Sequence, residues 1–248
     1  MPSKPRTITN PDRVNKVKTF LSDSLDDYIA SRVLFLSNLP QQAAILSSTA
    51  IEKCFKAILA FNGNESHGHL KSAHWKAVKN FNKNLFDKLN LDFLELNRKA
   101  YQLRYTDDLP IDFNLVIATR EFLAELDHTF ILIHELFTVD GDKERKTKFQ
   151  SLISTQDLRL IAENHVLLGT DKASFIYDSP QFIYEVRKPK NRDGLLESLY
   201  TSATKPEETS FLRTGFTVID LAKFIYKLSH MPLSEDNIAS QNTGGEAV

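Results

Sequence analysis

Apolar residues between Gln41 and Gly63 recur every three or four positions, a spacing that predicts a deeply packed helix. The recurring positions are Ala44, Ser47, Ile51, Cys54, Ile58 and Phe61, with Ala50, Phe55 and Leu59 widening the stripe. Glu52 and Lys56 lie inside this helix, four residues apart and in the order that supports helix formation when the pair is exposed. Because buried charges need partners, the pair is predicted to be either a structural tie or part of a site.

The same period predicts further helices on both sides of this segment. They cover residues 12–39, 72–90 (one helix or two short ones), 91–109 and 116–137. Short links between long helices imply that neighbours pack antiparallel. The fold is therefore predicted to be mainly α, with an antiparallel up-and-down bundle of four or five helices over residues 12–140.

The helix expected over 116–137 carries a second apolar flank, formed by Phe113, Phe122, Ile131 and Leu136. A stripe this wide can serve two partners, one inside the bundle and one in a second copy of the chain. A homodimer is therefore expected.

The composition changes around residues 139–142, and residues 143–230 are predicted to form a smaller C-terminal α+β extension. A short β-meander is expected from residues 165–168, 174–177 and 182–186. Helices are expected over residues 143–162, 195–200 and 216–229. Residues 1–11 and 231–248 have the composition of flexible tails.

Charge and composition narrow the class of protein. Lysine and arginine total 31 against 32 acids, and 17 of each sign precede position 142, so only a local patch could attract nucleic acid. Cys54 is the one cysteine, which rules out a disulfide framework or a cysteine-based metal site within the chain and fits a reducing cytoplasm. The polar N-terminus and the lack of a bilayer-length apolar run predict a soluble cytoplasmic protein without a membrane partner.

Histidines are densest between residues 63 and 75, where His67, His69 and His74 occur. They could hold a metal, but apart from Glu65 no acid or cysteine lies close enough to complete a ligand set. Loop and capping roles are therefore favoured, and neither a metal nor a cofactor is predicted.

A second candidate cluster follows at Arg104, Tyr105 and Asp107. The guanidinium of Arg104 is a planar fork able to hold a carboxylate or phosphate, and Asp107 is close enough in sequence to hold it in place. A structural ion pair between this loop and Glu52 or Lys56 is the favoured role, and a ligand site is the alternative.

Several of these residues together resemble the HEPN (higher eukaryotes and prokaryotes nucleotide-binding) family. The resemblance is carried by the run from Ala50 to Leu59, by His69-Leu70 and by Leu103-Arg104-Tyr105-Thr106-Asp107, where Thr106 replaces the proline of the family's Arg-Tyr-Pro-Asp motif. It covers residues 12–138. It implies a homodimer that binds a nucleotide or RNA, in some cases beside a separate nucleotidyltransferase chain or in a toxin–antitoxin or defence system.

Many HEPN proteins resemble metal-independent ribonucleases with an arginine followed, after four to six residues, by a histidine. No arginine in the first 141 residues has this spacing, and Arg120 and His128 miss it by one residue. Arg159 and His165 match it, but beyond the predicted bundle. Walker-type, dinucleotide and nucleophile-elbow motifs are also absent from the sequence.

The sequence thus favours a non-catalytic HEPN-like homodimer that binds a nucleotide, RNA or a protein partner. The predicted binding residues are Glu52, Lys56, His69, Arg104, Tyr105 and Asp107. One alternative is a divergent metal-independent ribonuclease that uses His69 or His128 from two subunits. Another is a structural dimer scaffold whose second half recruits a partner.

Overall fold

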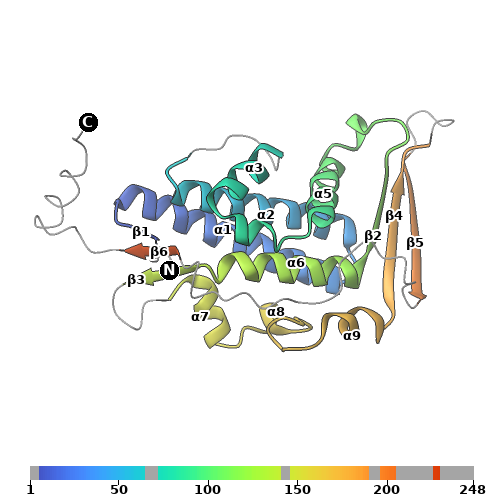
Figure 1. Ribbon diagram of the computed structural model, residues 1–248. Coiled ribbons are helices and arrows are strands. Elements are labelled where there is room, and N and C mark those ends of the chain that lie inside the picture. The colour runs from blue at the N-terminus through green and yellow to red at the C-terminus, as the bar shows by residue number, and fades with distance from the viewer. Residues whose placement is uncertain (1–5, 65–71, 141–145, 190–195, 205–225, 230–248) are drawn as a thin grey trace, which may run out of the picture.

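Three long helices lie side by side at the centre of the structure, a computed structural model (Figure 1). They are α1 (Pro11–Leu36), α2 (Pro40–Phe61) and α6 (Thr119–His134). The structure describes residues 6–64, 72–140, 146–189, 196–204 and 226–229. The mainly helical fold is confirmed over these residues, and the HEPN-like identity of the bundle stays a prediction.

Local sequence signals set the ends of the first two helices. The Asn10 side chain accepts a hydrogen bond from the Arg13 backbone N–H (3.0 Å), which caps the start of α1. Asn38 adopts a left-handed backbone conformation (φ 57°) and Pro40 begins α2, so the chain reverses within a few residues. At the other end of α2, Gly63 has a φ of 78°, which glycine adopts without strain.

Shorter helices cover α2 on one side. They are α3 (Ser72–Phe81), α4 (Lys83–Phe86), α5 (Leu91–Ala100) and the 3₁₀ helices η1 (Tyr101–Arg104) and η2 (Thr106–Asp108). Residues 72–90 thus form two helices, one of the two forms predicted. The helix expected over residues 91–109 is shorter, because α5 gives way to 3₁₀ turns.

The strands of the described residues form two three-stranded sheets. The first is antiparallel, in the order β2 (Asn114–Ala118), β4 (Gln181–Arg187), β5 (Glu197–Thr204). The second is parallel, in the order β1 (Arg6–Ile8), β6 (Tyr226–Ser229), β3 (Phe137–Asp140). In the first sheet, β4 pairs with β2, which precedes α6. In the second, β6 lies between β1, near the N-terminus, and β3, which follows α6.

The C-terminal residues pack on the bundle and share its core. The helices α7 (Lys148–Ser154), α8 (Leu158–Ile161) and α9 (Lys172–Tyr177) lie along the side of α6 opposite α3 and α5 (Figure 1). The hydrophobic core includes Phe149, Leu160, Phe175 and Tyr184 beside the bundle residues. The described part of residues 143–230 is therefore continuous in packing with the helices before it.

Several predicted elements are wrong. Residues 165–168 form turns, residues 174–177 belong to helix α9, and residues 197–200 are part of a strand instead of a helix. Asp171 explains the second case, because its side chain accepts from the Ser174 backbone N–H (2.9 Å) and caps a helix. The strand predicted over 182–186 is confirmed within β4, while most of the helix expected over 216–229 lies outside the described residues.

Both ends of the predicted bundle also differ from expectation. Val116, predicted to start the fourth helix, lies in β2, because this segment pairs with β4 and alternates exposed and buried residues. Arg6–Ile8, predicted as part of a flexible tail, forms β1. The long fourth helix is therefore shorter than predicted and is flanked by strands.

The α6 helix is covered within the chain. All its residues are buried except Arg120, which is partly exposed. The second apolar flank packs inside the monomer, where Phe122 contacts Phe35 (ring centroids 4.8 Å apart). Its four residues are 1–4 % exposed in the single chain, so this flank offers no open surface to a second copy, and the homodimer stays a prediction.

Candidate functional site

The predicted charged pair on α2 is formed and mostly buried. Lys56 Nζ donates to Glu52 Oε1 at 2.6 Å, and the two side chains are 19 % and 7 % exposed. The 3₁₀ helix η1 packs on α2, and Glu52 lies within electrostatic range of Tyr101 on η1. The ammonium group of Lys56 is therefore fixed by Glu52 in a position that is partly shielded from water.

Arg104 lies beside two tyrosine rings. Its guanidinium carbon is 5.3 Å from the ring centre of Tyr101 and 5.8 Å from that of Tyr105, and Nη1 donates to Tyr101 Oη at 3.1 Å. Burial raises the pKa of Tyr101, and the carboxylate of Glu52 acts in the same direction. Tyr101 thus lies within electrostatic range of Glu52 and links the two predicted clusters.

We call the group formed by Glu52, Lys56, Tyr101, Arg104 and Tyr105 the α2–η1 surface. Tyr105 is 55 % exposed and Arg104 is exposed, so this group presents an aromatic and cationic surface to solvent. Arg104 and Tyr105 therefore lie together, and Glu52 is linked to them electrostatically through Tyr101. Tyr101 was missed, although its position three residues before Arg104 places it on the same side of a helical turn.

The other predicted site residues lie elsewhere or outside the described chain. Asp107 is exposed on η2, whereas Arg104 contacts Tyr101 and Tyr105. Its backbone carbonyl instead accepts from Lys188 Nζ (3.3 Å), which also donates to the Leu109 carbonyl (2.7 Å). His67 and His69 lie outside the described residues, and His74 is buried on α3.

His128 is buried on α6, 8 % exposed, and lies within electrostatic range of Lys172 and His165. Burial, followed by the charge of Lys172 and by His165, lowers its pKa to about 3. It is therefore neutral near pH 7 and lacks the imidazolium form that would act as a general acid.

A buried polar network between α1 and α6 was not predicted. Arg32 Nη1 forms an ion pair with Asp127 Oδ2, and both side chains are fully buried. Tyr28 Oη donates to Asp127 Oδ1 (2.7 Å) and accepts from Asn164 Nδ2 (3.1 Å). Burial alone would lower the pKa of Arg32, but Asp127 raises it above its ordinary value, so the guanidinium stays charged.

A second buried ion pair joins α6 to α9. Lys172 Nζ bonds Glu125 Oε1, with 1 % and 3 % of the side chains exposed. His165 Nε2 lies 3.0 Å from the carbonyl oxygen of Ala124 and its ring stacks on Phe175. These polar groups hold the segment after α8 against α6. Because each bonds a buried partner within the chain, a structural role is favoured.

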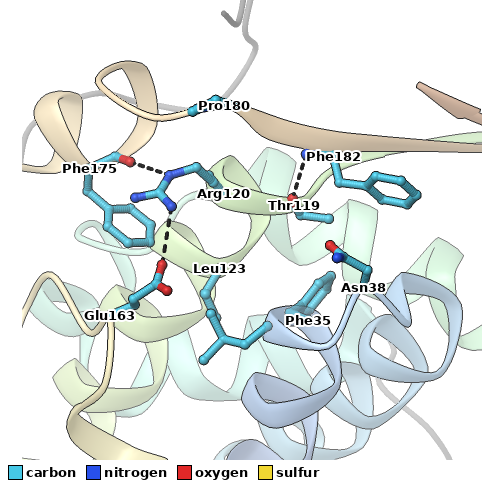
Figure 2. Close-up of a pocket in the computed structure, with 10 residues that line it drawn as sticks. Phe35, Asn38, Thr119, Arg120, Leu123, Glu163, Phe175, Pro180 and Phe182 are labelled. Carbon is cyan, nitrogen blue, oxygen red and sulfur yellow. Dashed lines mark hydrogen bonds and ion pairs between the residues drawn. The ribbon is translucent and has the colours of Figure 1, made fainter. Parts of the chain in front are cut away.

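An open pocket lies where α1 ends and α6 begins (Figure 2). It has a volume of about 150 Å³ and is lined by Phe35, Leu36, Asn38, Thr119, Arg120, Leu123, Glu163, Phe175, Pro180 and Phe182. The Arg120 guanidinium is held between the Phe175 ring and the Glu163 carboxylate, and the Phe182 backbone N–H donates to Thr119 Oγ1 (3.1 Å). Sequence reasoning missed this site because its residues come from four separate segments.

Within the part of the chain that the structure describes, no helix is long and apolar enough to cross a membrane. The same residues contain no cluster of three or more histidine, cysteine or acidic side chains placed to hold a metal ion. Comparisons of the chain with protein-family models, with curated proteins and with solved structures find no significant match.

The buried His134 on α6 predicts a pH dependence. Burial lowers its pKa to about 3, and Nε2 lies 2.9 Å from Ser24 Oγ. The unfolded chain therefore binds a proton that the folded chain does not, so this stabilisation is present above about pH 6.5 and is lost as the pH falls toward 3. His134→Gln should reduce the loss of unfolding free energy between pH 7 and pH 5 by up to about 2 kcal/mol.

Urea unfolding of wild type and His134→Gln at both pH values checks this expectation. The comparison between pH values removes any constant cost of the substitution. Equal pH dependence in the two proteins would show that His134 does not supply the linkage.

Proposed function

We propose that this chain is a non-catalytic, HEPN-like homodimeric protein that binds single-stranded RNA or a nucleotide through the α2–η1 surface. The observation that carries the proposal is that Arg104 lies beside two tyrosines, one of them largely exposed. The HEPN resemblance supplies the family and the homodimer. The same resemblance suggests that the chain acts beside a nucleotidyltransferase chain or in a toxin–antitoxin system.

The chemistry of this surface suits an unpaired nucleotide. Bases of single-stranded RNA stack on aromatic side chains and on arginine planes, and arginine also bonds phosphate in a bidentate manner. Tyr105 offers an exposed ring and Arg104 an exposed guanidinium. Lys56 adds a cation whose position Glu52 fixes (2.6 Å).

A balanced overall charge does not oppose this assignment. The chain carries 31 basic and 32 acidic residues, so binding depends on stacking and a few phosphate contacts more than on a broad basic field. The affinity is therefore expected to fall less steeply with salt than that of proteins with many phosphate contacts.

Binding of a fluorescent single-stranded RNA, measured by anisotropy, tests the proposal. Tyr105→Ala should weaken binding about tenfold, because loss of one stacked base costs about 1–3 kcal/mol. Arg104→Ala should weaken it at least as much, since it removes both a stacking plane and a charge. Both residues are exposed, so the thermal stability of the variants should change little.

Arg159→Ala is the matched control. Arg159 is an exposed arginine on α8, paired with Asp157 (2.6 Å), so the substitution makes the same charge change away from the α2–η1 surface. Equal loss of affinity in the control and in Arg104→Ala would refute the assignment. Cleavage of the RNA by the purified protein would refute the non-catalytic part and favour the ribonuclease alternative.

A further inference from the structure

A second binding site is provided by the pocket at the junction of α1, α6 and the segment after α8. We propose that it binds a small aromatic carboxylate, with the carboxylate on Arg120 and the ring against the apolar side chains that line the pocket. This site is separate from the α2–η1 surface and does not depend on its function.

Arg120 is held in place by contacts that leave part of its fork unused. Nε donates to the Phe175 carbonyl (2.6 Å), and the guanidinium carbon lies 4.2 Å from the centre of the Phe175 ring. Nη1 donates to Glu163 Oε2 at 3.2 Å. Among the described residues, these contacts use Nε and Nη1, so the guanidinium retains N–H donors for an incoming anion.

The contact with Glu163 shows that Arg120 can bind a carboxylate. Its carboxylate bonds Arg120 while its side chain is 55 % exposed, and such an exposed ion pair contributes little to stability. Its backbone is in the left-handed region (φ 51°), which is unfavourable for a residue with a side chain. A ligand carboxylate can therefore take the place of Glu163 at small cost.

The remaining lining suits an aromatic ring. Phe35 and Leu123 form the apolar base of the pocket, and Leu36, which is 39 % exposed, supplies accessible apolar surface at its rim. Figure 2 shows Leu123 below Arg120 and Phe35 beside Asn38, with Thr119 above these two. The pocket opens to solvent, and its volume of about 150 Å³ leaves room for a single ring.

A carboxylate fits this site better than a phosphate ester. The lining contains one arginine, and the neighbouring Glu163 is itself negative. A phosphate monoester carries close to two negative charges and three acceptor oxygens near neutral pH, which one arginine beside an acid cannot balance. A planar carboxylate matches the fork of one guanidinium.

Titration with benzoate, followed by calorimetry and by amide shifts in NMR spectra, tests the proposal. Saturable binding with shifts around Thr119 and Phe182 is expected. Benzamide has the same shape without the charge, and it should bind at least tenfold more weakly. Arg120→Gln should weaken benzoate binding at least tenfold, whereas Glu163→Gln should strengthen it severalfold because it removes the competing carboxylate.

Three outcomes would overturn the proposal. They are a lack of saturable binding by the wild-type protein, equal affinity for benzoate and benzamide, or weaker benzoate binding in Glu163→Gln. If Arg120→Gln does not fold, the comparison of the two ligands and the Glu163→Gln variant still decide the question. Arg104→Ala should leave benzoate affinity unchanged, and a loss there would place the binding on the α2–η1 surface instead.

Discussion

Asp127→Ala should lower the free energy of unfolding by about 3–5 kcal/mol. The substitution removes the carboxylate that pairs with Arg32 and leaves the fully buried guanidinium without an acidic partner among the described residues. It also removes the acceptor of the Tyr28 hydroxyl, which lies 2.7 Å from Asp127 Oδ1. A buried charge without its partner costs far more than the pair contributes, and this asymmetry sets the expected size.

Urea unfolding followed by circular dichroism measures this effect, and two comparisons define its origin. Lys83→Ala removes an exposed ion pair with Asp87, whose side chains are 69 % and 46 % exposed, and should change the unfolding free energy by no more than about 0.5 kcal/mol. The double variant Arg32→Met/Asp127→Leu should recover most of the loss, because it removes both charges. A loss below about 1 kcal/mol in Asp127→Ala would mean that the guanidinium reaches water in the folded protein.

Lys172→Met should destabilise the protein by about 3–5 kcal/mol, although it lies in the segment predicted as a separate extension. Methionine fills a similar volume, but it leaves the carboxylate of Glu125 buried without its partner. The Glu125→Gln/Lys172→Met double variant should be more stable than Lys172→Met alone, because the unpaired charge is then gone. Thermal and urea unfolding of the three proteins measure the difference.

The same experiment tests whether α9 unfolds with the bundle. Because Lys172 and Phe175 pack in the core that α6 shares, Lys172→Met should shift one cooperative transition. Two transitions, of which only the smaller shifts, would instead show that the C-terminal residues unfold separately. That result would support the domain boundary predicted near residue 141.

The central helix could be predicted from the sequence because local signals agree. Its apolar period, its Glu52–Lys56 pair and its end at Asn62-Gly63 all lie within one short segment, and the structure has α2 over Pro40–Phe61. Each of these signals depends on residues a few positions apart. Such short-range information is what a single sequence carries most directly.

β2 could not be predicted because its pattern fits two periods. Leu115 and Ile117 are buried and Val116 is 43 % exposed, the alternation of a strand, yet Val116 also fits the helical spacing of the residues that follow. The pairing with β4, which places Val116 opposite Glu185, decides in favour of the strand. That partner is distant in sequence, so the local pattern does not reveal it.

The sequence indicates that the members of the α1–α6 ion pair are buried, but not that they meet. Arg32 lies four residues after Tyr28 and three before Phe35, so it is on the buried face of α1, and Asp127 has the same relation to Leu123 and Phe130 on α6. The sequence thus indicates that each is buried. It does not show that the two meet, because 95 positions separate them. The Arg120–Glu163 pair, 43 positions apart, was missed for the same reason.

The helix α6 forms ion pairs with one residue that precedes it in the sequence, Arg32, and one that follows it, Lys172. The order of synthesis on the ribosome therefore affects when each pair can form. When α6 has emerged, Arg32 has already been made and can meet Asp127, but Lys172 follows Glu125 by 47 positions and β4 has not yet been translated. Nascent chains that end near residue 140 therefore leave the Glu125 carboxylate and an unpaired β2 edge open to solvent. Such intermediates are the species that chaperones are expected to bind during biosynthesis of this protein.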